Sequence, residues 1–283
     1  MMTTTGSNTT YSFSRLSAFH QCKKEYYLNY AVSVYECKDC GKLFWEQKDQ
    51  PAHSCPSCGG SSLKVLKKKN NAFAEYGSFV HELMEKTAKG ELAEYELLSI
   101  YEEEYPVYVP SEFPPNSFTD LAESYYMDGY RFLMNFEGVG EDYETVDVEK
   151  HFTADFDGFS LQGFIDLLLK DKDGGFVVWD WKSKKKFASK AEQAKYAHQL
   201  YLYSKYVFDT YGVFPKTLIF YHFRADKPTV IKFDEKAYKE ALKWASDTVK
   251  EIEKNTDYPC TVDDFYCKNL CNWRHVCEHG REE

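Results

Sequence analysis

The sequence lacks any apolar run that approaches the roughly 20 residues of a membrane-spanning helix. Its first residues also lack the basic and apolar regions of a secretory signal peptide. We therefore expect a cytoplasmic protein with no membrane partner. An excess of basic charge is missing as well, because 35 Lys and Arg stand against 45 Asp and Glu, a formal net charge of -10. Such a balance is unusual for a nucleic-acid-binding protein, whose affinity comes largely from Lys and Arg on phosphates.

The distribution of charged residues along the sequence is more informative about nucleic-acid binding than the net charge. Lysines gather in residues 64–69 and 182–195, whereas many acids lie in residues 91–104 and near the C-terminus. Either lysine run is compatible with a solvated face, but for the second run we favour phosphate contact. The length of 283 residues and the aromatic content of 17% indicate a chain that can bury a sizeable core.

Two apolar, β-like runs are separated by a short turn sequence rich in Gly and Asp: residues 164–170 and 176–182. This pattern predicts a β-hairpin. Each run carries one acid, Asp166 or Asp180, and burying either without a cation would cost several kcal/mol or more. Lys182 lies two residues after Asp180, so both side chains point to the same face of the strand. The hairpin therefore predicts a metal site with an ammonium group beside it.

The remaining periodicity predicts alternating strands and helices. Helices are expected at residues 14–30, 70–90, 190–211 and 234–255, and strands at residues 145–156, 159–170, 217–224 and 228–233. Residues 91–137 look helical around a loop at 106–115. This succession predicts the α/β class.

Two Cys-x-x-Cys pairs, separated by 14 residues, are typical of a zinc ribbon: Cys37, Cys40, Cys55 and Cys58. Metal binding is the better interpretation than disulfides for a cytoplasmic chain with nine cysteines. Four thiolates leave no open position, so the predicted zinc is structural and supplies folding energy. A redox function is a weaker interpretation, because the surroundings are not thioredoxin-like. What the ribbon binds stays open: Phe44, Trp45 and the lysines of 64–69 suit DNA, and a protein partner nearly as well.

These features together resemble the PD-(D/E)xK nuclease superfamily. In its RecB-like branch, which includes AddB and the CRISPR-adaptation nucleases, a Gly-x-x-x-His helix precedes the hairpin and a Gln-x-x-x-Tyr helix follows it. Here Gly77 to His81 and Gln199 to Tyr203 stand in those places. The acid-x-lysine motif alone is weak, but the four signals in this order are specific. The resemblance covers roughly residues 11–30, 76–86, 145–224 and 258–277.

The resemblance implies a restriction-endonuclease-like core, a mixed central sheet flanked by helices, formed by residues 1–34 and 71–283 with the zinc ribbon inserted at 35–70. It implies catalytic roles for Asp166, Asp180, Lys182, Gln199 and Tyr203. It also implies ligands for Mg²⁺ or Mn²⁺: His81, Asp166, Asp180 and the backbone carbonyl of Trp181. A water activated by the ion and by Lys182 would attack the phosphodiester. Glu149 stands where this branch often carries an acid; it binds metal, holds a water, or lies on the solvent face.

Late cysteines suggest a second metal centre. Cys22 alone reads as a buried thiol, but with three late cysteines it resembles the iron-sulfur staple of AddB-type nucleases, in which four thiolates hold a [4Fe-4S] cluster between the N- and C-terminal regions. The implied ligands are Cys22, Cys267, Cys271 and Cys277. That family spaces its late cysteines two and then five residues apart, whereas the gaps here are three and five. The extra residue is compatible with absorption in a turn, with zinc, or with reduced thiols, and Cys260 is a substitute ligand.

The expected function is that of a metal-dependent exonuclease acting on DNA ends or single strands in recombination, repair or phage DNA processing. One alternative is a catalytically inactive DNA-binding subunit with a nuclease fold; the presence of the acids, the lysine and the histidine argues against it. The other is a zinc-ribbon adaptor that binds a protein. The polarity of cleavage is not readable from these residues.

Overall fold

A computed structural model describes residues 9–281 and divides the chain into two compact units. The first unit consists of the described residues of Met1–Phe13 and of Ala72–Lys250. The second consists of Ser14–Asn71 and the described residues of Glu251–Glu283. The predicted zinc ribbon thus shares a compact unit with the two segments that carry the other five cysteines. Its status as an insertion confined to residues 35–70 stays a prediction.

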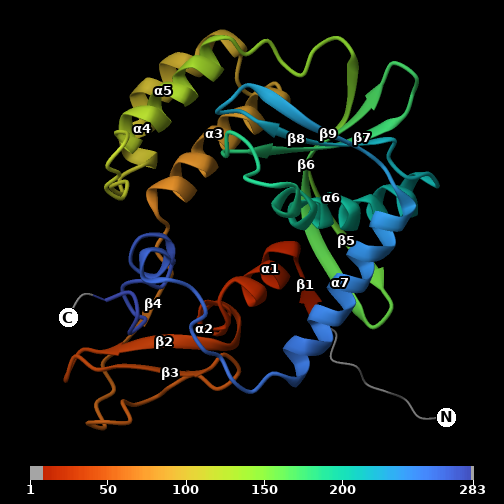
Figure 1. The fold of residues 1–283 in the computed structure, drawn as a ribbon. Coiled ribbons are helices and arrows are strands. Elements are labelled where there is room, and N and C mark those ends of the chain that lie inside the picture. Colours follow the sequence, from red (N-terminus) through yellow and green to blue (C-terminus); the bar gives the residue numbers. More distant parts are fainter. Residues whose placement is uncertain (1–8, 282–283) are drawn as a thin grey trace, which may run out of the picture. The chain divides into compact units, whose positions relative to one another are not determined.

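The first unit is built on a six-stranded mixed sheet (Figure 1). The strand order is β1-β6-β7-β8-β9, with β5 paired to β6. Pairs β1–β6 and β7–β8 are parallel, and the other pairs are antiparallel. The strands are β1 Thr10–Tyr11, β5 Tyr143–Phe156, β6 Phe159–Asp171, β7 Phe176–Lys182, β8 Thr217–His222 and β9 Lys227–Lys232. The predicted mixed α/β class is confirmed, and so is the hairpin of β6 and β7.

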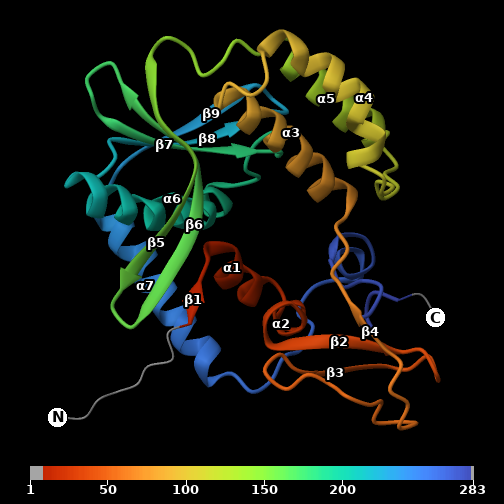
Figure 2. The same cartoon turned by 180° about the vertical axis from the view of Figure 1, so that it is seen from behind.

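Helices flank both faces of this sheet (Figures 1 and 2). They are α3 Ala72–Ala88, α4 Leu97–Tyr108, α5 Leu121–Met134, α6 Lys190–Tyr211 and α7 Glu235–Lys254, with a short 3₁₀ turn η2 at Glu94–Glu96. The alternation along β7 decides which side chains meet which helices. Val177, Trp179 and Trp181 belong to a core shared with α3, α4 and α5. Asp180 and Lys182 therefore point to the opposite face, where α6 packs on β7.

Local sequence signals set the ends of α6 and α7. The Ser189 hydroxyl accepts a hydrogen bond from the Glu192 amide at 3.1 Å, and α6 ends at Gly212, whose φ is 75°. The Asp234 carboxylate likewise accepts from the Ala237 amide at 2.8 Å. These N-caps and the glycine C-cap explain why both helices match their predicted ranges.

The second unit combines a three-stranded antiparallel sheet, of order β3-β2-β4, with short helical segments. Its elements are α1 Phe13–Gln21, which begins one residue before the unit, α2 Lys23–Tyr26, a π-helical turn η1 Tyr27–Ala31, β2 Val32–Cys37, β3 Leu43–Gln47, β4 Leu63–Leu66 and a second π-helical turn η3 Tyr266–Leu270. Buried residues from both parts of the unit, among them Val32, Val34 and Trp273, form its core.

The prediction of one helix over residues 14–30 was wrong. The helix breaks at Cys22, whose backbone is extended (φ -152°, ψ 113°). Apolar periodicity cannot reveal this break, because Leu16, Phe19 and Tyr26 are buried on both sides of it. Within residues 9–281, no helix has the length and apolar character needed to cross a bilayer.

Candidate active site and metal centres

Three acids form a row across three adjacent strands. Leu167 of β6 pairs with Trp179 of β7, so the next position along the ladder brings Asp166 opposite Asp180. On the other edge of β6, Val148 pairs with Leu167 and Lys150 with Ile165, which brings Glu149 opposite Asp166. Asp166 and Asp180 are buried, with exposed fractions of 9% and 3%. Strand register therefore concentrates negative charge at one place in the sheet.

Helix α3 supplies His81 to this row. Its Nε2 lies 2.9 Å from Asp166 Oδ2, and its Nδ1 lies 3.5 Å from Glu149 Oε1. Gly77, one turn earlier, allows α3 to approach β7 closely: a Cβ there would lie 3.2 Å from the Ser183 hydroxyl. The Gly-x-x-x-His spacing thus brings the backbone of α3 close to the loop after β7 and the imidazole onto the acids.

Lys182 is held by two partners on its own face of the sheet. Its Nζ lies 2.5 Å from Asp180 Oδ2 and donates to Gln199 Oε1 at 3.2 Å. The Gln199 amide nitrogen donates in turn to Asp180 Oδ1 at 2.7 Å and to the Tyr203 hydroxyl at 3.3 Å. One glutamine on α6 therefore orients the lysine and the acid together. Tyr203 closes the network, and Gly163 leaves room for its ring, because a Cβ there would lie 2.7 Å from Tyr203 Cε1.

Crowded charges shift the titration of this site. Burial raises the pKa of Glu149 to about 7, and repulsion from Asp166 adds to the shift. Burial also raises the pKa of Asp180, against the opposing effect of Lys182. For His81, burial disfavours the charged form, but the surrounding acids, led by Asp166, outweigh it and raise the pKa to about 9. An imidazolium thus provides the positive charge that the acids require.

The donor set fits a divalent cation. Ligand atoms of His81, Glu149 and Asp166 all lie within 4.8 Å of one another. Carboxylate oxygens with one imidazole suit Mg²⁺ or, better, Mn²⁺. Asp180, which the sequence also predicts as a ligand, instead contacts Lys182 and Gln199. The Trp181 amide donates to Asp166 Oδ2 at 2.7 Å, which brings the Trp181 backbone beside the site.

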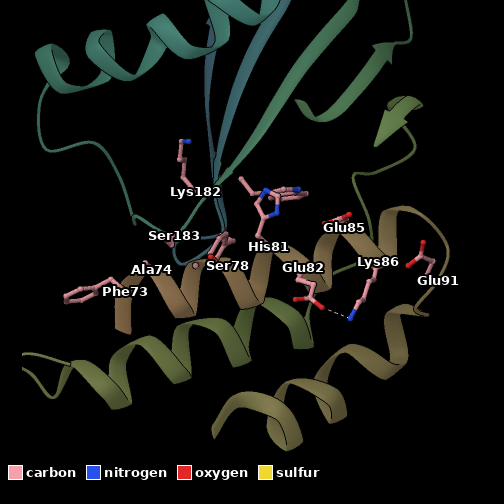
Figure 3. A pocket seen from close by; sticks show the side chains of 13 residues that line it. Phe73, Ala74, Ser78, His81, Glu82, Glu85, Lys86, Glu91, Lys182 and Ser183 are labelled. Atoms are coloured by element: carbon pink, nitrogen blue, oxygen red, sulfur yellow. Dashed lines mark ion pairs between the residues drawn. The ribbon is translucent and has the colours of Figure 1, made fainter. Parts of the chain in front are cut away.

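A groove of about 740 Å³ borders the site, and His81 and Trp181 belong to its lining (Figure 3). His81 and Lys182 both line it, from α3 and from the end of β7, together with Ser78 and Ser183. Farther along α3 the lining includes Glu82, Lys86 and Glu85, and Glu91 follows beyond the end of the helix. Lys86 forms an ion pair with Glu82 at 2.6 Å. The imidazole of His81 is thus reached from the groove, whereas Lys182 Nζ contacts Asp180 and Gln199, which do not line it.

One group of residues near the site was missed by the sequence reasoning. Asp128 of α5 is buried and accepts from Arg224 at 2.7 and 3.1 Å, while Lys185 Nζ lies 2.9 Å from the same carboxylate. Arg224 also stacks on Tyr125, 3.2 Å from the ring centroid. This network anchors the loop that follows Lys182. No local signal distinguishes Asp128 from a surface acid of a helix, so only the fold identifies it.

In the second unit, the four ribbon cysteines come together. Cys37 Sγ lies 3.6 Å from Cys58 Sγ, and Cys40 Sγ lies 3.7 Å from Cys55 Sγ. Zn–S bonds of about 2.3 Å place tetrahedral sulfurs about 3.8 Å apart. All four sulfurs lie within 4.8 Å of one another, so the donor set fits one zinc ion.

The terminal cysteines line one small cavity: Cys22, Cys260, Cys267, Cys271 and Cys277. Cys260 Sγ lies 4.0 Å from Cys22 and 3.4 Å from Cys267, so the residue taken as a substitute ligand lies inside the cluster. The π-helical turn η3 joins Cys267 to Cys271, whose amide donates to the Tyr266 carbonyl at 2.9 Å. A π turn holds one residue more than an α turn, which accommodates the extra residue between these cysteines. Five cysteine side chains therefore line this one cavity.

Comparison with known proteins gives one informative match. The family model of the PD-(D/E)XK nuclease superfamily matches residues 10–278. No curated protein matches the sequence. A solved structure described as "Crystal structure of SSO0001" is similar at 15% identity over 77% of this chain and 90% of that chain, with a TM-score of 0.31. That likeness is too distant to bear on the function. Because the family model spans nearly the whole chain, this protein belongs to the PD-(D/E)XK nuclease superfamily.

Proposed function

We propose that this chain is a metal-dependent DNA exonuclease of the RecB-like branch, acting on DNA ends or single strands in recombination, repair or phage DNA processing. Membership of a superfamily of metal-dependent nucleases supports the general reaction. The observation that carries the proposal is the row of Glu149, Asp166 and Asp180, with His81 in contact with the first two and Lys182 in contact with the third. Such a set of charges would be costly to retain without a reaction that uses it.

The metal-binding residues are proposed from the donor set. Asp166, His81 and Glu149 would hold a Mg²⁺ or Mn²⁺ ion, and Asp180 and the Trp181 carbonyl would complete a site for one or two ions. When bound, the ion supplies charge stabilisation for the phosphoryl group and makes the attacking water easier to deprotonate. It also neutralises the acids, so that a polyanionic substrate can approach this part of the sheet.

The remaining residues position the reactants. Lys182 would hold or activate the attacking water, because its ammonium group contacts Asp180 beside the acids of the site. Gln199 would keep that ammonium group in place through its paired contacts, and Tyr203 would fix the glutamine. Preorganised charges of this kind account for much of the rate in hydrolytic enzymes.

Removing the central groups tests the proposal directly. We expect Asp166→Ala and Lys182→Ala each to lower the cleavage rate of end-labelled single-stranded DNA by at least about 10²–10³-fold, because charge stabilisation at the phosphorus is lost. The assay uses added Mg²⁺ or Mn²⁺ and measures shortening from the labelled end. Lys227→Ala, an exposed change on β9, serves as the matched control. A rate within tenfold of wild type in either site variant would refute the assignment.

The same assay addresses the inactive alternative. An inactive DNA-binding subunit would bind the labelled strand and leave it intact with either ion, and Asp180→Ala would then change nothing. Shortening from one end only would instead establish the exonuclease and its polarity together.

Two structural metal centres are proposed for the second unit. Cys37, Cys40, Cys55 and Cys58 would hold zinc, and the ribbon would offer a surface to a protein partner. Cys22, Cys267, Cys271 and Cys277 would hold a [4Fe-4S] cluster, with Cys260 as the fifth thiol of the cavity. Iron, sulfide and zinc analysis of the purified chain tests both. A content of two zinc ions and no iron per chain would mean that the terminal cysteines hold a second zinc ion and no iron-sulfur cluster.

A further inference from the structure

A second groove, of about 400 Å³, lies in the second unit beside the sheet of the zinc ribbon. Its apolar lining includes Leu28, Val32 and Trp273, and its cations are Lys48, Lys67 and Lys68. None of its lining residues is acidic. The groove of the catalytic unit differs, because three glutamates line it.

The positive charge of this groove is not cancelled by neighbouring carboxylates. Lys48 Nζ donates to the neutral backbone carbonyl of Asn29 at 2.6 Å. Burial lowers the pKa of Lys48, and the Arg15 guanidinium adds repulsion. Within residues 9–281, no carboxylate forms an ion pair with Lys67 or Lys68, and both side chains are exposed. The wider segment agrees, because residues 14–71 contain 10 Lys or Arg and 5 Asp or Glu in a chain of net charge -10.

A fixed amide adds a neutral donor to these cations. Trp273 Nε1 donates to Asn29 Oδ1 at 2.9 Å, so the Asn29 oxygen faces the indole and its NH₂ group faces away. Among the described residues, that NH₂ group donates no hydrogen bond. Ammonium groups beside an oriented amide donor are the usual contacts of phosphate oxygens.

We propose that this groove binds the phosphate backbone of single-stranded DNA, as a second contact with the substrate in addition to the catalytic groove. The inference rests on the proposed function only in taking DNA as the substrate. A single strand fits better than a duplex, because its unstacked bases can cover the apolar lining and the Tyr30 ring while its phosphates meet the lysines. A duplex would offer phosphates alone and leave the apolar lining uncovered.

Salt-dependent binding provides the test. The full chain carries Asp180→Asn to prevent cleavage, and no chelator is used, so that the cysteine sites keep their metals. Binding of a dye-labelled 20-nucleotide single strand is followed by fluorescence anisotropy at several salt concentrations. We compare Lys48→Gln/Lys67→Gln/Lys68→Gln with the control Lys38→Gln/Lys42→Gln/Lys268→Gln, which removes three charges of the same unit outside the groove.

We expect the groove variant to bind at least about tenfold more weakly, and its log K against log [salt] slope to fall by about 2, since each phosphate contact contributes about 0.7. The control should stay within twofold of the parent. Lys67→Gln/Lys68→Gln, which changes exposed side chains only, should give an intermediate loss and guards against misfolding of the triple variant.

Equal DNA binding by the groove and control variants would overturn the inference. An acidic protein segment would then be the better candidate ligand of the groove. Absence of DNA binding by the parent would overturn it as well. The outcome is independent of catalysis: a chain that binds through the groove but never cleaves would refute the proposed nuclease and retain this inference.

Discussion

At the scale of single residues, the backbone of Glu149 has a strained conformation. Its φ of 49° lies in the left-handed region, which costs a non-glycine residue on the order of 1 kcal/mol or more. The strain coincides with a place opposite Asp166, where its carboxylate lies 3.5 Å from His81. A strand residue on the solvent face would have no reason to adopt this conformation, so we favour a role at the metal site.

The titration of Glu149 leads to a prediction about stability. Its pKa is raised to about 7 by burial and by Asp166, so the folded protein binds this proton more tightly than the unfolded chain does. The contribution of Glu149 to the free energy of unfolding is therefore fully present below about pH 4.5 and is lost as the pH rises toward 7. Without Mg²⁺ or Mn²⁺, we expect Glu149→Gln to be more stable than wild type at pH 8 by on the order of 1–2 kcal/mol, and to lose that advantage near pH 5.

Thermal unfolding of both proteins across this pH range measures the difference. Added Mn²⁺ should stabilise the wild type more than Glu149→Gln at pH 8, because the glutamine lacks the carboxylate that would bind the ion. An identical response of the two proteins to Mn²⁺ would exclude Glu149 from the site. Glu144→Gln, on the same strand, is the control.

Gln199 is the second residue whose role follows from its contacts. It bridges Lys182 and Asp180, and no other residue on α6 donates to that carboxylate among the described contacts. We expect Gln199→Ala to lower kcat by roughly 10–100-fold, the range typical of groups that orient catalytic ligands. The free energy of unfolding should fall by only about 1 kcal/mol, because one partly buried hydrogen-bonding group is lost. Steady-state cleavage kinetics and denaturant unfolding check both expectations, and an unchanged kcat contradicts the positioning role.

At the scale of elements, the close approach of α3 to the loop after β7 delivers His81. The contact depends on Gly77, where even a methyl group would lie 3.2 Å from the Ser183 hydroxyl. We expect Gly77→Ala to be nearly neutral for cleavage, because the serine hydroxyl can move by a few tenths of an ångström. Gly77→Leu should push α3 away, lower cleavage by at least about tenfold and cost about 1–3 kcal/mol of stability.

Cleavage rates and unfolding midpoints of the two variants test this contact. Ala74→Leu, one turn earlier on the same groove wall, is a useful comparison for groove blockage. If Gly77→Leu cleaves as well as wild type, the spacing of α3 does not control the histidine.

At the scale of the whole molecule, the proposed catalytic residues and the proposed structural metal sites lie in different units. All the proposed catalytic residues belong to the first unit, and all nine cysteines belong to the second. The core of the second unit includes Val32 and Val34 of β2, so deleting residues 35–65 would remove part of its sheet as well as the ribbon knuckles. A single ligand change is the cleaner experiment.

We expect Cys55→Ser to release about one zinc ion per chain and to lower the thermal stability of the second unit, because the site loses one of its four sulfurs. At a saturating concentration of a short single strand, cleavage should stay within about threefold of wild type, since the first unit has its own core and the proposed second contact affects binding only. Metal analysis and the end-labelled assay test this, with Ser54→Ala as the control. Loss of cleavage while the first unit stays folded would mean that the ribbon binds the substrate.

The sequence by itself determined the features that depend on near neighbours. The hairpin of β6 and β7, the ranges of α6 and α7, and the paired Cys-x-x-Cys motifs follow from periodicity, capping and spacing over a few residues. The acid-x-lysine strand was readable for the same reason. A local pattern also gave a wrong prediction: the apolar stripe of residues 14–30 is uninterrupted, yet the helix breaks at Cys22.

Only the tertiary structure decided which of these features meet. Strand register brings Glu149 and Asp180 to either side of Asp166, and the packing of α3 adds His81 from 85 positions earlier in the chain. Cys22 and Cys260 are 238 positions apart, yet their sulfurs lie 4.0 Å apart. Such contacts depend on how whole elements pack, and the energy that holds them comes from cores built by many residues, which no local pattern contains.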